Sequence, residues 1–570
     1  MKLLALIRFS SRAFFVVVTC AMAMLAASST AQQPASVQLD KLGTVDFPTS
    51  GSAQAQAHFL RGVAALHSFW YEVALEEFRK STKIEPDFVM GYWGEAMAHN
   101  HPIWGDPQET EAARKVLANI RDTSKLTPRE RAYVQAVQVL YGDGEKPARD
   151  RVYSAAMEKI YRDFPDDVEA ALFYALSLMG TVSPEDPAGV QTRLRAGAIA
   201  SEVYKKHPNH PGAAHYVLHA FDDPDNAAKA LDAARRYAVI APAAPHALHM
   251  PSHIFLQLGM WPEAAASNEA SWAASDTWVK QKNLPLSKRD YHSLHWLLYI
   301  YLQQGHYARA EALLTQMRQS LAEFPKDDPR NLMFGTFILA NMAATFVVET
   351  AQWDTAEQWL GAPREQAANS QSQTQTSSGA HPMQADVGVT QVPVIFARGL
   401  ARAVQGSPEA QKSMAELQAM RARQAAMQVP FIAQILKLTE IQEVEIAAMA
   451  AAAQGNEAIP SMRQATALEE ALPPPPGPPL VIKPAHELFG EILLRAKRPK
   501  EAAEQFATSL HRHKNRARSL LGAARAAAQS GDTQGAANFY AQFAQQWQQA
   551  DAQLPELREA QDYLKQANVR

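Results

Sequence analysis

Cysteine is almost absent from this 570-residue chain, and the only one, Cys20, lies in the N-terminal segment. That segment has a positively charged start, an apolar run over residues 13–27 and small residues at 29–31. Such an arrangement is typical of a secretory signal peptide, and a retained anchor is the alternative. We therefore predict removal of residues 1–31 and export to the periplasm or the cell exterior. The exported chain then has neither thiols nor disulfides, so its stability depends on packing.

Other absences exclude further classes of protein. The net charge is −3, with 55 basic and 58 acidic side chains, so the balance indicates no polyanionic partner, and no nucleic acid is expected. No second stretch is predicted to be long and apolar enough to span a bilayer, so the exported chain is not expected to be an integral membrane protein. Phosphate-binding loops, dinucleotide fingerprints, a His-Glu-x-x-His motif and a Ser-His-Asp order are missing. A non-enzymatic protein is therefore favoured.

Helical spacing dominates the rest of the sequence. Alternating β-branched runs are scarce, whereas Ala, Leu, Glu, Gln, Arg and Lys recur at helical periods. The stretch FLRGVAALHSFWYEVALEEFRKSTKIEP carries Gly62, Ala65, Ala74, Phe78 and Pro86 at fixed offsets. Small residues let two antiparallel helices approach, an aromatic ring fills the gap, and proline ends the second helix. These features predict an all-α fold of helix-turn-helix repeats.

The offsets match the tetratricopeptide repeat (TPR) pattern, and the chain resembles that family, in a secreted or periplasmic bacterial-type form. The match is strongest over residues 55–88, 211–320 and 483–548. The resemblance implies a superhelical solenoid of about eight or more hairpins. It also implies a concave groove, lined by the first helix of each unit, that receives a protein or peptide partner.

Two segments interrupt the array. Residues 366–386 are rich in Ser and Gln and are predicted to form a flexible polar loop. The run ALPPPPGPPLVIKP is predicted to form a stiff proline-rich spacer. The expected division is a signal peptide (1–31), a lead segment (32–54), a repeat array (55–365), the loop (366–386), a second helical repeat region (387–470), the spacer (471–484) and a C-terminal repeat pair with a capping helix (485–570).

Histidine recurs in phase with the repeats. Seven of the 18 histidines fall between His207 and His253, far more than even spreading would give. The pairs His215/His219 and His249/His253 are separated by 34 positions. Within the helices that contain them, they lie opposite the apolar stripe, which predicts that they point away from the core. The resemblance implies that positions two, five and nine of each repeat contact ligand. The expected ligand-binding residues are His215, His219, His246, His249, His253, His292, His295 and Tyr299.

Two hypotheses use this histidine cluster. In the first, the groove recognises a protein segment or another ligand through imidazole hydrogen bonds. In the second, His215, His219, His249 and His253 hold a metal ion, with Zn or Cu expected, in a metal-binding protein or a metal-dependent hydrolase. Imidazole is the commonest ligand for these metals, and i, i+4 spacing places two ring nitrogens on one side of a helix. Nearby carboxylates that could join are Asp222, Asp223, Glu269 and Asp290. A purely architectural scaffold is the third possibility.

The C-terminal region offers two weaker candidates. Glu487 and Glu491 occupy repeat positions five and nine, where a cationic ligand could bind. The stretch HRHKNRAR, from His511 to Arg518, is expected to form a solvated basic turn.

Overall fold

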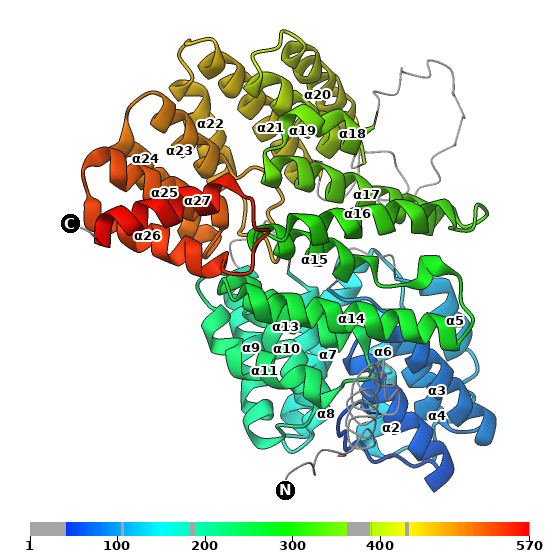
Figure 1. The fold of residues 1–570 in the computed structure, drawn as a ribbon. Helices are drawn as coiled ribbons and strands as arrows, with labels where there is room; N and C mark the ends of the chain where they lie inside the picture. Colours follow the sequence, from blue (N-terminus) through cyan, green and yellow to red (C-terminus); the bar gives the residue numbers. More distant parts are fainter. Residues whose placement is uncertain are drawn as a thin grey trace, which may run out of the picture. The chain divides into compact units, whose positions relative to one another are not determined.

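The computed structural model describes residues 41–103, 108–182, 189–361, 388, 390–427 and 432–568. These belong to one compact unit, Leu39–Arg570. Throughout these ranges the regular elements are all helices, packed as neighbouring antiparallel pairs (Figure 1). The predicted all-α helix-turn-helix repeat fold is thereby confirmed. The predicted signal peptide, the whole of the predicted polar loop (366–386) and the predicted lead segment up to residue 40 lie outside the described residues.

The helices follow one another with short connections. The first part contains α2 (Ala53–His67), α3 (Tyr71–Ile84), α4 (Val89–Met97), α5 (Thr110–Leu117), α6 (Pro128–Leu140), α7 (Lys146–Asp163), α8 (Val168–Gly180) and α9 (Gly189–Lys206). The middle part contains α10 (Pro211–Ala220), α11 (Leu231–Ile240), α12 (Pro245–His249), α13 (Pro251–Gln257), α14 (Trp261–Gln281), α15 (Tyr291–Gln303), α16 (Tyr307–Ala322), α17 (Pro329–Thr350) and α18 (Ala356–Leu360). The last part contains α19 (Val392–Val404), α20 (Ala410–Ala425), α21 (Ile432–Ala453), α22 (Ile459–Glu470), α23 (Ala485–Arg495), α24 (Pro499–Arg512), α25 (Ala517–Ser530), α26 (Thr533–Gln546) and α27 (Pro555–Asn568).

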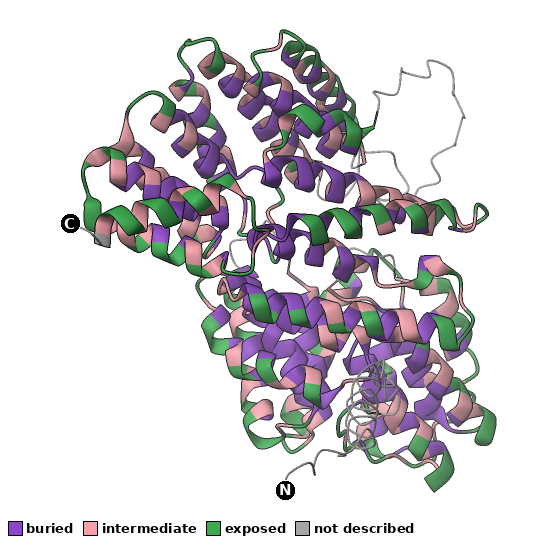
Figure 2. Ribbon diagram, in the orientation of Figure 1, coloured by how far each residue is buried: buried purple, intermediate pink, exposed green. Residues whose placement is uncertain are grey.

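Aromatic rings inserted between glycines set the helix spacing. Phe78 of α3 is fully buried, and its ring lies against Gly62 of α2 and Gly94 of α4. Phe506 of α24 takes the same role between Gly490 of α23 and Gly522 of α25. A side chain at these glycines would occupy the space of the ring, so the small residues are required by close helix approach. Buried residues accordingly line the facing sides of the helices, as Figure 2 shows.

The proline-rich segment and the C-terminal helices pack against the middle repeats. The carbonyl of Pro475 accepts a hydrogen bond from Gln257 Nε2 at 2.9 Å, and Gly477 lies against the indole of Trp296. Trp547 Nε1 donates to the carbonyl of Gln303 at 3.0 Å. The segment predicted to be a spacer therefore contributes contacts of its own to the middle of the chain.

The expected solvated basic turn is wrong for its central residue. Arg516 is fully buried and donates to both carboxylate oxygens of Glu487, at 2.7 and 3.0 Å. It also lies 2.7 Å from Glu349 Oε1. Glu491 accepts from Lys483 Nζ at 2.6 Å. The carboxylates considered for a cationic ligand thus pair with cations of the same chain: Glu487 with Arg516, which precedes α25, and Glu491 with Lys483, which precedes α23.

One described helix is long and apolar enough to cross a membrane. This helix is α17, and 56% of its most apolar window is buried within the fold. The expectation that no stretch beyond the N-terminal segment reaches that length and hydropathy is therefore wrong. The helix contacts α15, α16 and α19, and its buried Glu349 pairs with Arg516, which is the environment of a core helix.

We predict that Gly490→Ala lowers the midpoint of thermal unfolding. The added methyl would lie 2.7 Å from Phe506 Cζ, and overpacking of this kind costs about 1–3 kcal/mol. Adding Phe506→Leu opens space for the methyl, so the double variant should lose less than the sum of the two single losses. Additive losses, measured by thermal melts followed by circular dichroism, would contradict a direct glycine–ring contact.

His513 gives a pH-dependent prediction. Burial lowers its pKa to about 3, and the charges of Arg516 and Arg512 lower it further. The unfolded chain takes up this proton below about pH 6.5 and the folded chain does not, so stability falls as pH decreases from about 6.5 towards 3. The variant His513→Gln lacks this group and should lose stability less steeply, by up to about 1.4 kcal/mol per pH unit. Other histidines titrate equally in both proteins. Parallel curves of unfolding midpoint against pH would contradict the prediction.

Candidate metal centre

Six histidines from four helices of the middle repeats converge. They are His215 and His219 on α10, His246 and His249 on α12, His253 on α13 and His292 on α15. Pro251 separates α12 from α13, because a proline nitrogen carries no hydrogen for the helical ladder. The structure thus brings together the four residues predicted as metal ligands, and two further histidines from the predicted ligand-binding set join them.

The first group consists of His215, His219 and His246. One ligand nitrogen from each lies within 4.8 Å of the others. The two Nε2 atoms of His215 and His246 are 3.1 Å apart, and the rings of His215 and His219 have centroids 4.6 Å apart. The Nε2 atom of His219 is buried, and the described residues provide it with no hydrogen-bond partner.

The second group consists of His249, His253 and His292, again with one nitrogen each within 4.8 Å. The Nε2 atoms of His249 and His253 are 3.1 Å apart. The ring of His292 lies 4.7 Å from that of His249. The two groups adjoin, since ring centroids are 6.1 Å apart for His246 and His249 and 6.3 Å apart for His219 and His253.

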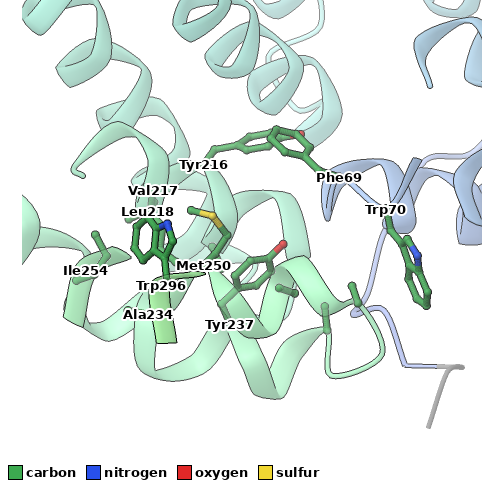
Figure 3. Packing of buried hydrophobic residues seen from close by; sticks show 14 of the residues in the cluster. Phe69, Trp70, Tyr216, Val217, Leu218, Ala234, Tyr237, Met250, Ile254 and Trp296 are labelled. Carbon is green, nitrogen blue, oxygen red and sulfur yellow. The ribbon is translucent and has the colours of Figure 1, made fainter. Parts of the chain in front are cut away.

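Aromatic side chains cover both groups. The ring of Phe69 lies 4.4 Å from His215 and 5.6 Å from both His219 and His246. The ring of Trp296 lies 4.2 Å from His253 and 4.9 Å from His249. Figure 3 shows both covering residues within the hydrophobic cluster around α10 and α13.

The histidines are therefore more enclosed than the sequence pattern suggests. His215, His249 and His253 are buried, and His219, His246 and His292 are half-buried. The expectation that the predicted histidines point away from the core is wrong for the three buried ones, His215, His249 and His253. The side of each helix opposite its apolar stripe is covered by residues of neighbouring repeats, which a single helix pattern does not report.

Phe69 reaches its place through an unusual backbone conformation. It has φ of 51°, at the turn between α2 and α3. The equivalent turn after α13 uses Gly259 and the one after α15 uses Gly305, with φ of 67° and 72°. A bulky residue in this left-handed region costs of order 1–3 kcal/mol. The ring that this strain positions packs on all three histidines of the first group.

Burial sets the electrostatics of the cluster. It lowers the pKa of His215 to about 3 and the pKa of His292 to about 4. It also holds the pKa values of His219, His246 and His249 well below 6.5, with repulsion between neighbouring imidazoles adding to the effect. These rings are consequently neutral at pH 7, and a neutral imidazole nitrogen is the form that binds metals.

Three of the rings are held by hydrogen bonds at Nδ1. His215 Nδ1 lies 2.6 Å from the carbonyl of His67, and His253 Nδ1 lies 2.6 Å from Asp222 Oδ2. His249 Nδ1 lies 2.7 Å from Asn268 Oδ1, and the amide nitrogen of Asn268 donates to the carbonyl of Ala264. The amide orientation is thus fixed, and its oxygen faces His249. In each case an acceptor oxygen takes the Nδ1 hydrogen and leaves Nε2 turned toward the cluster.

This arrangement leaves two lone pairs facing each other. A neutral imidazole carries one N–H, and both His249 and His253 use it at Nδ1. Their Nε2 atoms, 3.1 Å apart, can attract each other only if one ring is an imidazolium or if a cation lies against both. The low pKa of His249 disfavours the imidazolium on that ring.

A third polar group supports the first. His67 Nε2 lies 2.5 Å from Glu169 Oε2, and His210 Nε2 lies 2.9 Å from Glu169 Oε1. Burial raises the pKa of Glu169, but the charges of the two histidines outweigh it and lower that pKa. This triad also holds His67, whose carbonyl orients His215. Sequence spacing does not indicate this triad, because His67 lies 102 residues before Glu169 and Glu169 lies 41 residues before His210.

Other predicted residues belong to different surroundings. The hydroxyl of Tyr299 accepts from Arg516 at 3.1 Å, within the buried ion-pair network. His295 follows His292 on α15 and has its pKa lowered to about 3 by burial, but it is a member of neither group. Glu269 accepts from Tyr301 at 2.6 Å, and Asp223 accepts from the backbone of Asp225 and Asn226. Asp290 caps α15. Among the four carboxylates considered, Asp222 is hydrogen-bonded to a clustered histidine, at Nδ1 of His253.

Comparison with known proteins gives low similarity throughout. No family model and no curated protein matches the sequence. Among solved structures, the human IFIT1 dimer with m7Gppp-AAAA is 12% identical, with 92% of this chain and 91% of that chain covered and a TM-score of 0.33. Yeast Tom70 is 11% identical, with 90% and 96% covered and a TM-score of 0.32. The P58(IPK) TPR domain is 12% identical, with 71% and 100% covered and a TM-score of 0.20. The helix pairs described above therefore define the fold, and the histidine cluster defines the candidate site.

Proposed function

We propose that this chain is a helical-repeat protein whose six-histidine cluster binds a transition metal. The observation that carries the proposal is the pair of facing Nε2 atoms of His249 and His253, each ring having its Nδ1 bonded to an acceptor. A metal ion bound by both nitrogens removes the repulsion of their lone pairs. The same ion would gain a third ligand from His292.

The distances suit such an ion. Zinc binds imidazole nitrogen at about 2.0–2.1 Å, and two nitrogens 3.1 Å apart then subtend roughly 100° at the ion. That angle lies near the tetrahedral value that zinc sites adopt. His215 and His246 offer the same separation in the first group.

The donor set narrows the choice of metal. Imidazole suits Zn, Cu, Fe and Ni, whereas Mg, Ca and Mn prefer carboxylate, carbonyl and water oxygens. Both groups are composed of imidazole alone. Copper and zinc thus remain the expected ions. The Nδ1 hydrogen bonds to Asp222, Asn268 and the His67 carbonyl are the interactions that orient metal-binding histidines in proteins.

Recognition of a protein or peptide partner and a metal-dependent hydrolase remain predictions, and so does an architectural role. These functions differ in how accessible the six imidazole rings must be. A recognition groove needs imidazoles that a partner can reach, whereas three of the six rings are buried. This enclosure favours a small ion over a polypeptide as the ligand. Export of the chain likewise remains part of the proposal.

We expect the mature chain, purified without a histidine tag, to retain stoichiometric zinc or copper by elemental analysis. The variant His249→Ala/His253→Ala removes both facing nitrogens and should lose the metal of the second group. The matched control is His511→Ala, since the His511 side chain is 63% exposed and lies on α24. Wild-type protein that binds neither Zn nor Cu after equilibration at pH 7.5 would overturn the proposal.

We further expect Asp222→Asn to weaken metal binding about 10- to 100-fold, because the carboxylate that orients His253 and increases its basicity becomes neutral. The neighbouring Asp223→Asn is the control, since Asp223 bonds the turn that follows α10. Dissociation constants can be measured by competition with a chromophoric chelator. Equal constants for the two variants would show that Asp222 does not act through a metal ligand.

A further inference from the structure

We infer that the two histidine groups form one dinuclear centre, in which two copper ions share a small bridging anion such as hydroxide. The inference rests on the proposed function and adds the number of ions, their coupling and the class of ligand that joins them. It is carried by the juxtaposition of two three-imidazole groups, one on α10 and α12 and the other on α12, α13 and α15.

The groups are joined through α12. His246 belongs to the first group and His249 to the second, and only three positions separate them on a single short helix. Their ring centroids are 6.1 Å apart, and His219 and His253 approach to 6.3 Å on the other side. The two groups therefore adjoin at two points.

Each group is one ligand short of a four-coordinate ion. Three imidazoles leave a fourth position on each metal, as in catalytic metal sites, where water or substrate fills it. Two-metal sites in proteins have ions about 3.5–4 Å apart and hold an oxygen between them. If the two ions each have one vacant coordination position and lie next to each other, a single bridging atom can fill both positions.

Charge balance favours an anion in that position. The six imidazoles are neutral ligands, Asp222 is hydrogen-bonded to His253, and Asp290 caps α15, which carries His292. Two divalent ions bring more positive charge than these two carboxylates offset. Burying the excess is costly, and a bridging hydroxide reduces it. Metal-bound water readily supplies hydroxide, because the ion lowers the pKa of the water to about 7.

Copper allows the bridge to be detected by electron paramagnetic resonance, because a bridging anion couples the spins of two Cu(II) ions. We expect the untagged chain to bind two Cu(II) per molecule, with most of this copper silent in electron paramagnetic resonance. The variant His219→Gln/His246→Gln impairs the first group and His253→Gln/His292→Gln the second. Each should bind one Cu(II) and show the full signal of an isolated ion. Glutamine keeps a polar side chain of similar size, and the matching alanine variants, checked by far-ultraviolet circular dichroism, guard against misfolding.

The outcomes distinguish failure of the dinuclear centre from failure of metal binding itself. His511→Ala should behave as the wild type in both copper content and signal. Two bound ions with a full, uncoupled signal would overturn the bridged pair and leave metal binding intact. One bound ion in the wild type would also overturn it, and the double variants would then show which group holds the ion. A chain that binds no copper and no zinc would overturn both proposals.

Discussion

The site depends on three hydrogen bonds that hold Nδ1 of His215, His249 and His253. Each one commits the only hydrogen of a neutral imidazole to an oxygen, and so decides that Nε2 faces the cluster as a bare lone pair. The acceptors are the carbonyl of His67 at the end of α2, the side-chain oxygen of Asn268 on α14, and the carboxylate of Asp222, which follows α10. Packing of the repeats fixes them before any ligand arrives. Without these bonds the rings could rotate and exchange hydrogens with one another. Their Nε2 lone pairs would then not be held in a position to bind a metal ion.

The rest of the fold keeps those acceptors in place. The Glu169 triad, buried between α2, α8 and the start of α10, holds the His67 backbone whose carbonyl bonds His215. Gln257 joins Asp222 at 3.2 Å to the carbonyl of Pro475, so the proline-rich segment supports the carboxylate that bonds His253. Phe69 takes a strained left-handed conformation here, whereas glycine takes it at the turns after α13 and α15. Rigidity around the six rings is thus built from sequence-distant pieces.

How far the sequence predicts this arrangement depends on which interactions are local. Helix pairs follow from small and aromatic residues at repeat spacing, as with Phe78 between Gly62 and Gly94, and the 34-residue offset correctly placed the histidines of α10, α12 and α13 close together. Burial was not predictable from a single helix, because Phe69 and Trp296 that cover the rings come from other repeats. Tyr299 occupied the predicted register position, yet Arg516, more than 200 residues later, determines its surroundings. The position of a residue in the repeat predicts which face of the helix its side chain lies on. Its contacts depend on how the repeats pack, which the local sequence does not report.

The cluster also links metal binding to the stability of the repeats. The facing Nε2 lone pairs of His249 and His253 and the buried Nε2 of His219 cost free energy, and that cost exists only in the folded chain. An ion that binds the folded form alone stabilises it by RT ln(1 + [L]/Kd), which is about 2.7 kcal/mol at a hundredfold excess over Kd. The proposed ions would have their ligands on α10 and α12 in the first group and on α12, α13 and α15 in the second, so together they would join three successive repeats. In a solenoid, whose units otherwise contact only their neighbours, such a link acts at the interfaces on which cooperativity depends. A chain expected to lack disulfides would thereby gain a cross-link of another kind.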